Sequence, residues 1–303
     1  MPFDLPNALT GERVEFSSAA GRLSYYRSQP PSAANASPLL LVHSINAAGS
    51  AYEMKPIYEH FRPQRIVYAI DLPGFGFSER SDRPYSPRIM TDAVKSMVDR
   101  IRSDAGEVPI DAIALSLGSE FLARAASEQP KLYRTLGLIS PTGMDSGAPY
   151  DDAPGTTRGM PWLYATFRNP IWSQAFFDLL TSRMSIRFFL KKTYGRPEID
   201  EDLLEYDYLT THQPGGRYAP YRFVSGYLFS KDITRIYRSL AMPVWVAHGV
   251  RGDFVDYSGL KEFAPRPNWT IERMQTGALP HFEMRQDFMR RYETFLARAA
   301  TPE

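Results

Sequence analysis

Ser116 stands in the stretch IALSLGSEF (113–121), where an apolar, β-branched run gives way to a helical pattern. Serine nucleophiles at a strand–turn–helix junction have the pattern G-x-S-x-G, and here Ala114 takes the first glycine position and Gly118 the second. The turn is so tight that only small residues fit two positions before and two positions after the serine. Because alanine adds only one methyl group, the spacing still favours Ser116 as a nucleophile.

A nucleophilic serine needs a base, and the base needs an acid that holds its tautomer. Of the five histidines, His281 follows the last expected strand, and Asp253 follows the strand before it. The chain order serine, aspartate, histidine is typical of nucleophiles presented in this way. We therefore predict that His281 removes the Ser116 proton and that Asp253 orients the imidazole, with Asp256 and Asp145 as alternative acids.

Short apolar runs that alternate with helical spacing are the elements that must position these residues, and they indicate βαβ units and a parallel sheet. A hairpin is expected over 12–27. Buried strands are expected at 38–44, 65–73, 110–116, 136–141, 243–249 and 269–277, and helices at 51–61, 88–104, 118–128 and 282–299. The three candidate catalytic residues then lie at or beyond the carboxyl ends of strands, where open α/β sheets bind ligands.

The alternation stops between about 144 and 238. This segment begins with Gly, Pro and Asp, becomes dense in aromatic residues and contains no evident strand. We predict a mostly helical insertion at 144–238 that forms a cap over a core built from 1–143 and 239–303. Trp162, Tyr221 and Phe223 of this insertion are candidates for lining an apolar pocket.

Five stretches in a fixed order resemble the motifs of the α/β-hydrolase fold family: LLLVHS, DLPGFGFSE, LSLGS, HGVRGD and GALPHFE. The resemblance covers nearly the whole chain. It implies a mostly parallel twisted sheet with helices on both faces and a helical cap insertion. The segment 144–238 falls where this family inserts its cap.

The turn at Ser116 directs the Leu117 N–H into the space above the sheet, where it can bind an oxyanion. The resemblance implies that Ile45 provides the second N–H donor. In this chain His43-Ser44 replaces the usual His-Gly, which makes both residues candidates for shaping the pocket. The loop from Gly249 to Asp253 is also one residue longer than the common spacing.

These residues predict a serine hydrolase that cleaves a carboxylic ester or thioester of an apolar or aromatic small molecule through an acyl-enzyme. The same residues also suit carbon–carbon bond hydrolysis or cofactor-free lyase chemistry, because fold does not decide the reaction. A hydrolase-like protein that binds a small molecule is the alternative outside the enzymes. A serine at position 116 argues against the reactions that use an aspartate nucleophile.

Composition excludes several other classes. The 303-residue chain has a formal net charge of +1 and scattered basic residues, so no nucleic-acid partner is expected. It has no cysteine and no metal-ligand spacing, and we predict neither metal nor cofactor. The start lacks a signal peptide and no apolar run is long enough to span a membrane, so a cytoplasmic location is expected. The oligomeric state is left open.

Overall fold

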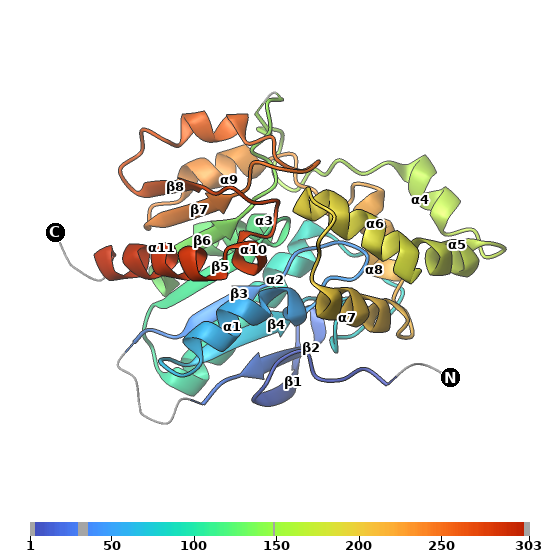
Figure 1. Cartoon of the computed structure of the whole chain (residues 1–303), viewed down its shortest axis with the longest axis horizontal. Helices are drawn as coiled ribbons and strands as arrows, with labels where there is room; N and C mark the ends of the chain where they lie inside the picture. The colour runs from blue at the N-terminus through green and yellow to red at the C-terminus, as the bar shows by residue number, and fades with distance from the viewer. Residues whose placement is uncertain (1–3, 30–35, 148, 300–303) are drawn as a thin grey trace.

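An eight-stranded sheet forms the centre of the molecule in the order β1-β2-β4-β3-β5-β6-β7-β8 (Figure 1). The computed structural model describes residues 4–29, 36–147 and 149–299. The strands are β1 Glu12–Ser18, β2 Gly21–Arg27, β3 Leu39–Val42, β4 Val67–Asp71, β5 Ile110–Leu115, β6 Tyr133–Ile139, β7 Val244–His248 and β8 Trp269–Arg273. Strand β2 is antiparallel to both of its neighbours, β1 and β4, and every later pairing is parallel. The predicted α/β architecture and the leading hairpin are confirmed.

Helices cover both faces of the sheet, which explains why its central strands read as unbroken apolar runs. On one face lie α1 Lys55–Phe61 and α11 Arg285–Arg298, and on the other α2 Pro87–Ala105, α3 Gly118–Glu128 and α9 Ile233–Ser239. Successive residues of a strand point to opposite faces. In β5, Ala112 and Ala114 accordingly belong to one apolar core, and Ile113 and Leu115 belong to the other.

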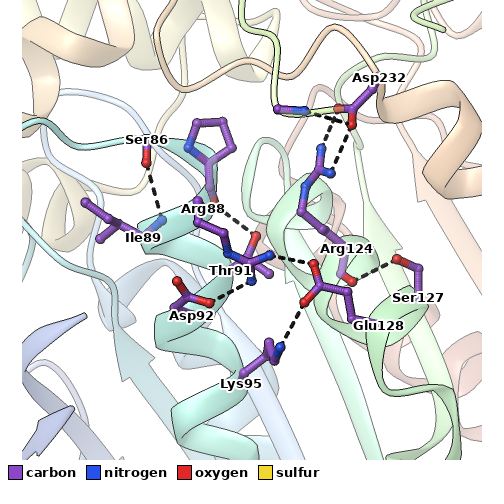
Figure 2. Close-up of polar contacts among 12 residues, drawn as sticks. Ser86, Arg88, Ile89, Thr91, Asp92, Lys95, Arg124, Ser127, Glu128 and Asp232 are labelled. Carbon is purple, nitrogen blue, oxygen red and sulfur yellow. Dashed lines mark hydrogen bonds and ion pairs between the residues drawn. The ribbon is translucent and has the colours of Figure 1, made fainter. Parts of the chain in front are cut away.

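Helix α3 is tied to its surroundings by ion pairs (Figure 2). Glu128 accepts from Arg88 at 2.5 Å and from Lys95 at 2.8 Å, both on α2. Arg124 makes a bidentate contact with Asp232, at 2.5 Å and 3.1 Å, just before α9 begins. Removing one partner of such a buried pair leaves an uncompensated charge. These contacts therefore fix the helix that follows Ser116.

The chain between β6 and α9 is helical, and it contains the aromatic segment singled out in the sequence. Its helices are α4 Pro161–Phe167, α5 Ser173–Leu180, α6 Arg183–Tyr194, α7 Glu201–Thr211 and α8 Tyr218–Val224. The described residues of 144–238 form no strand, and their sole β-contact is an isolated bridge between Thr157 and Ser230. Helices α4 and α5 lie at one end of the molecule, away from the sheet (Figure 1). The last helix of the range, α9, packs on α3 and so lies with the sheet.

Arg80 joins the turn after β4 to helix α7. Its guanidinium donates to the carbonyl of Gly76 at 3.0 Å and 2.5 Å, and to Thr210 at the main-chain oxygen (2.6 Å) and the hydroxyl (2.9 Å). All of these acceptors are uncharged. The hydrogen bonds of this side chain thus connect helix α7 to the turn after β4 without an ion pair at that point.

None of the helices in the described part of the chain combines the length and the apolar character needed to cross a membrane.

Candidate active site

Ser116 occupies the turn between β5 and α3 in a conformation that few serines adopt. Its φ is +51°, in the left-handed region, and its N–H donates to the carbonyl of Ile139 on β6 at 2.7 Å. Its own carbonyl accepts from Ser119 N at 3.0 Å, which begins the helix. Such backbone strain persists only where the surrounding structure enforces it, and it clusters at functional sites. The residue is half-buried, whereas both of its neighbours in the chain are buried.

Gly118 shows why the second small residue of the motif is required. A Cβ atom at this position would lie 2.3 Å from the carbonyl oxygen of His43, well inside contact distance. The absence of a side chain therefore lets the loop after β3 pack directly against the Ser116 turn. Ala114 is buried in the sheet with its methyl group accommodated. Leu117 and Ile45, the residues predicted to donate to an oxyanion, are both buried beside this junction.

His43 orders the loop after β3, and its fully buried ring corrects its assignment as a pocket candidate. Its Nε2 accepts from Leu72 N at 2.8 Å, so the neutral ring carries its proton on Nδ1 and donates it to the Ser44 carbonyl at 2.6 Å. Burial lowers the pKa of His43 to about 4, partly offset by the bond to Ser44. With both nitrogens occupied and the ring fully buried, His43 supports the backbone.

Glu53 is a buried residue of this site that the sequence interpretation missed. It lies in the short helical turn Ala51–Met54 and accepts three hydrogen bonds from Ser44 and Asn46. Ser44, which replaces the usual glycine, therefore has a partner nine residues further along the chain. The available signal was a lone acidic residue inside the stretch AYEM, at the start of an apolar helical pattern.

His281 lies in α10, Pro280–Glu283, and is fully buried. Its Nε2 is 2.8 Å from the main-chain oxygen of Glu53, and because a carbonyl only accepts, Nε2 must carry the proton. The lone pair of the neutral ring is then on Nδ1, which is buried and has no hydrogen-bond partner among the described residues. Burial lowers the pKa of His281 to about 4, although the bond to Glu53 acts in the opposite direction.

Two hydrogen bonds from the end of β6 connect the Ser116 turn to the histidine loop. Ile139 accepts from Ser116 N, and the next residue, Ser140, donates from its hydroxyl to the Ala278 carbonyl at 2.8 Å. Ser140 also has a positive φ, +47°, which turns the chain sharply at this point. The loops of Ser116 and His281 are thus neighbours, and in the part of the chain that the structure covers no direct hydrogen bond joins the two side chains.

Asp253 is not placed beside His281, which corrects the predicted acid contact. Its carboxylate is 52% exposed and pairs with Lys192 of α6 at 2.5 Å. The backbone of this loop also packs against the end of α6. Asp253 N donates to the Lys192 carbonyl at 3.3 Å, and a Cβ on Gly252 would lie 2.4 Å from the same oxygen. The loop from Gly249 to Asp253, which is one residue longer than the common spacing, therefore extends outward to the end of α6.

The two alternative acids are also engaged elsewhere. Asp256 accepts from the N–H and hydroxyl of Ser146 at 2.9 Å and 2.6 Å, and these bonds, with those from Ser258, hold its pKa well below its usual value. Asp145 accepts from the Tyr150 hydroxyl at 3.0 Å and from Gly147 N at 3.0 Å. Neither contacts His281 in the described structure.

The predicted pocket residues are scattered. Trp162 is 69% exposed on α4, and Tyr221 is 2% exposed inside the helical segment, where its hydroxyl donates to the Ser173 carbonyl and its ring stacks on Phe167. Both assignments are corrected, because a solvent-facing ring and a fully packed ring do not line a pocket. Phe223 is half-buried against Phe229, with ring centroids 5.4 Å apart, at the seam with the main core.

Asp71 shapes the turn after β4, as its motif suggests. Its carboxylate accepts from Ala51 N at 2.9 Å and Phe77 N at 3.0 Å, and a Cβ on Gly76 would collide with it. Burial raises the pKa of Asp71 to about 6, while these donors act to lower it. No cluster of three or more His, Asp or Glu suited to a metal ion occurs among residues 4–29, 36–147 and 149–299.

Solved structures of several hydrolases are similar to this fold. The carboxylesterase CesB from Bacillus subtilis matches with a TM-score of 0.69 at 18% identity, covering 95% of this chain and 91% of its own. The Cif epoxide hydrolase from Acinetobacter nosocomialis matches with 0.69 at 18% identity, covering 94% and 88%. A meta-cleavage product hydrolase matches with 0.67 at 16% identity, covering 95% and 98%. At these identities the likeness establishes the fold alone.

No curated protein matches the sequence. The sequence model of the alpha/beta hydrolase family, in contrast, matches residues 39–291, which include the Ser116 turn, the loop after β3 and His281. By this match, and with the sheet order and helical layers described above, the chain belongs to the alpha/beta hydrolase family.

Proposed function

We propose that this protein is a serine hydrolase that cleaves a carboxylic ester or thioester of an apolar small molecule. The observation that carries the proposal is the strained Ser116 turn, at φ +51°, with the loop after β3 packed against it through Gly118. A backbone held this way exposes a nucleophile and aims N–H groups at one point.

In the proposed reaction, His281 takes the proton of the Ser116 hydroxyl on the unprotonated ring nitrogen. The ring is free to accept this proton at pH 7, because burial lowers its pKa to about 4 and so keeps it neutral. Ser116 Oγ attacks the carbonyl carbon, and the Leu117 and Ile45 N–H groups stabilise the oxyanion. His281 then gives the proton to the leaving alcohol or thiol. Water releases the acid from the acyl-enzyme by the same steps in reverse.

The proposed mechanism assigns no carboxylate to His281, because Asp253 is paired with Lys192. The Glu53 carbonyl holds the imidazole tautomer instead. We further propose that α4–α8 form a cap over the site and that Phe223 lines its inner side.

A fluorophosphonate probe tests the nucleophile directly. The wild-type protein should be labelled at Ser116 and should hydrolyse p-nitrophenyl esters, and Ser116→Ala should do neither. Ser119→Ala is the matched control, since this neighbouring serine is buried and its hydroxyl donates to the Ala114 carbonyl at 3.3 Å. Equal labelling of the wild type and Ser116→Ala would refute the proposal. Turnover of β-diketones with none of simple esters would move it to carbon–carbon bond hydrolysis.

A further inference from the structure

Glu53 is a fully buried carboxylate that touches both sides of the proposed site. Its oxygens accept from Ser44 N at 2.8 Å, from the Ser44 hydroxyl at 2.9 Å and from Asn46 Nδ2 at 2.6 Å. Its main-chain oxygen accepts from Nε2 of His281 at 2.8 Å. One residue therefore joins the loop that packs on the Ser116 turn to the proposed base.

The three side-chain contacts require a group that only accepts hydrogen bonds. A carboxylate offers about four acceptor positions, whereas the amide nitrogen of glutamine can only donate. Burial raises the pKa of Glu53, and the donors from Ser44 and Asn46 oppose that shift. Ser44 supplies a hydroxyl donor that a glycine at this position lacks. The unusual serine and the buried glutamate thus form a matched pair.

The rest of the loop is folded tightly around this pair. Ala48 N donates to the Asn46 side chain at 2.6 Å, and a Cβ on Gly49 would lie 2.6 Å from the Ser44 carbonyl. Ile45 stands between two residues that both bind the Glu53 carboxylate. The orientation of its peptide N–H is therefore set by hydrogen bonds on either side of it.

We propose that Glu53 is a positioning residue, whose carboxylate aims the Ile45 N–H at the oxyanion and whose carbonyl holds His281. This inference rests on the proposed serine-hydrolase function. Glu53 acts through Ser44, Asn46 and His281, and it does not touch the substrate. Because an oxyanion donor acts on the transition state, losing its alignment lowers kcat and leaves KM nearly unchanged.

The test compares Glu53→Gln with the wild type in the full-length protein. We expect kcat for a p-nitrophenyl ester to fall about 10- to 100-fold with KM within about threefold. The rate of fluorophosphonate labelling of Ser116 should fall by a similar factor. Asp111→Asn is the matched control, since Asp111 is also buried and bonds to Arg65, Arg134 and Thr135, at the opposite end of β5. It should lower Tm and leave kcat within about threefold.

The outcomes separate the two proposals. The positioning role would be overturned if Glu53→Gln lowers Tm as Asp111→Asn does but leaves kcat unchanged. If Glu53→Gln does not fold, Ser44→Ala and Asn46→Ala each remove one hydrogen bond to the Glu53 carboxylate and should lower kcat about three- to tenfold. Unchanged kcat in both would overturn the inference. An active Ser116→Ala would instead overturn the proposed function, whatever Glu53→Gln does.

Discussion

Two loops at the carboxyl ends of the parallel strands carry residues of the predicted site, and their surroundings differ. The loop after β3 is buried, folded on itself and bonded to Glu53, and it packs on the Ser116 turn. The loop after β7 extends to the surface, where Asp253 pairs with Lys192. Hydrogen bonds to the buried Glu53 carboxylate fix the side chains of the first loop, whereas the second loop follows the backbone of α6 and leaves the Asp253 carboxylate in an exposed ion pair. The types of the residues and their order in the chain therefore predict side-chain contacts better in a buried loop than in an exposed one.

The largest expected effect is at the base. His281→Ala should lower kcat/KM for a p-nitrophenyl ester at least about 10⁴-fold, because removing the base leaves only binding and oxyanion stabilisation. His248→Ala provides the control, since this half-buried ring bonds to the Gly249 carbonyl and packs on Tyr257. A loss below about tenfold in His281→Ala would remove the histidine from the mechanism.

The close approach at Gly118 is the next feature to break. Gly118→Ala places a methyl group against the His43 carbonyl, so the loop must shift. We expect kcat to fall about 10- to 100-fold, because small misplacements of reacting groups are costly. Steady-state kinetics with a melting curve measures both effects. Ala114→Gly restores the common glycine and should keep kcat within about threefold, and similar losses in the two variants would contradict the steric argument.

The pH profile tests the burial of the base. Because burial lowers the pKa of His281 to about 4, the ring stays neutral, and competent as a base, as pH falls from 7 to about 5. The acid limb of kcat/KM should therefore lie near pH 4, below the ordinary histidine value of about 6.5. Circular dichroism over the same range separates this limb from acid unfolding. A limb at pH 6–7 would show that the working ring is solvated.

Asp253 should matter far less than the base. Exposed ion pairs contribute little, so Asp253→Asn should change kcat less than about fivefold, as should Lys192→Gln. The measurement is kcat at pH 7 and at low ionic strength. A loss of about 10⁴-fold in Asp253→Asn alone would mean that this carboxylate leaves Lys192 and reaches His281 during turnover.

The smallest effect is expected at Trp162. Its ring is exposed on α4, so Trp162→Ala should leave KM for an apolar ester within about twofold. Phe223→Ala should raise KM about five- to tenfold, since burying part of an aromatic ring against the substrate contributes about 1 to 1.4 kcal/mol. The comparison is made across esters of increasing acyl length. The reverse ranking would place substrate on the outer side of the helical segment.

The pattern of apolar residues predicted the sheet well, because strands that are buried on both faces are continuous runs of apolar residues in the sequence. Strand β6 begins at Tyr133, earlier than the expected 136, since Arg134 and Thr135 are polar. Both bind the buried Asp111, which no periodicity rule reveals. The predicted helix 282–299 is interrupted at Met284, which separates α10 from α11.

The site was predictable where the backbone decides and unpredictable where side chains compete. The Ser116 motif and its small neighbours demand one turn, and the turn is present. The predicted contact between Asp253 and His281 is not made because the carboxylate pairs with Lys192, which lies in a helix 61 residues away in the chain. Glu53 was hidden because a single acidic residue in a helical pattern normally lies on a solvated face.

The hydrogen bonds that Arg80 makes to Thr210 of α7 set a condition on access to the buried histidine. If α7 lifts from the sheet to admit a ligand, the guanidinium must give up its bonds to Thr210. Dissolved ions screen charge pairs, but both of these acceptors are neutral. Breaking this contact should therefore depend on temperature and hardly at all on ionic strength, unlike entry controlled by surface charge.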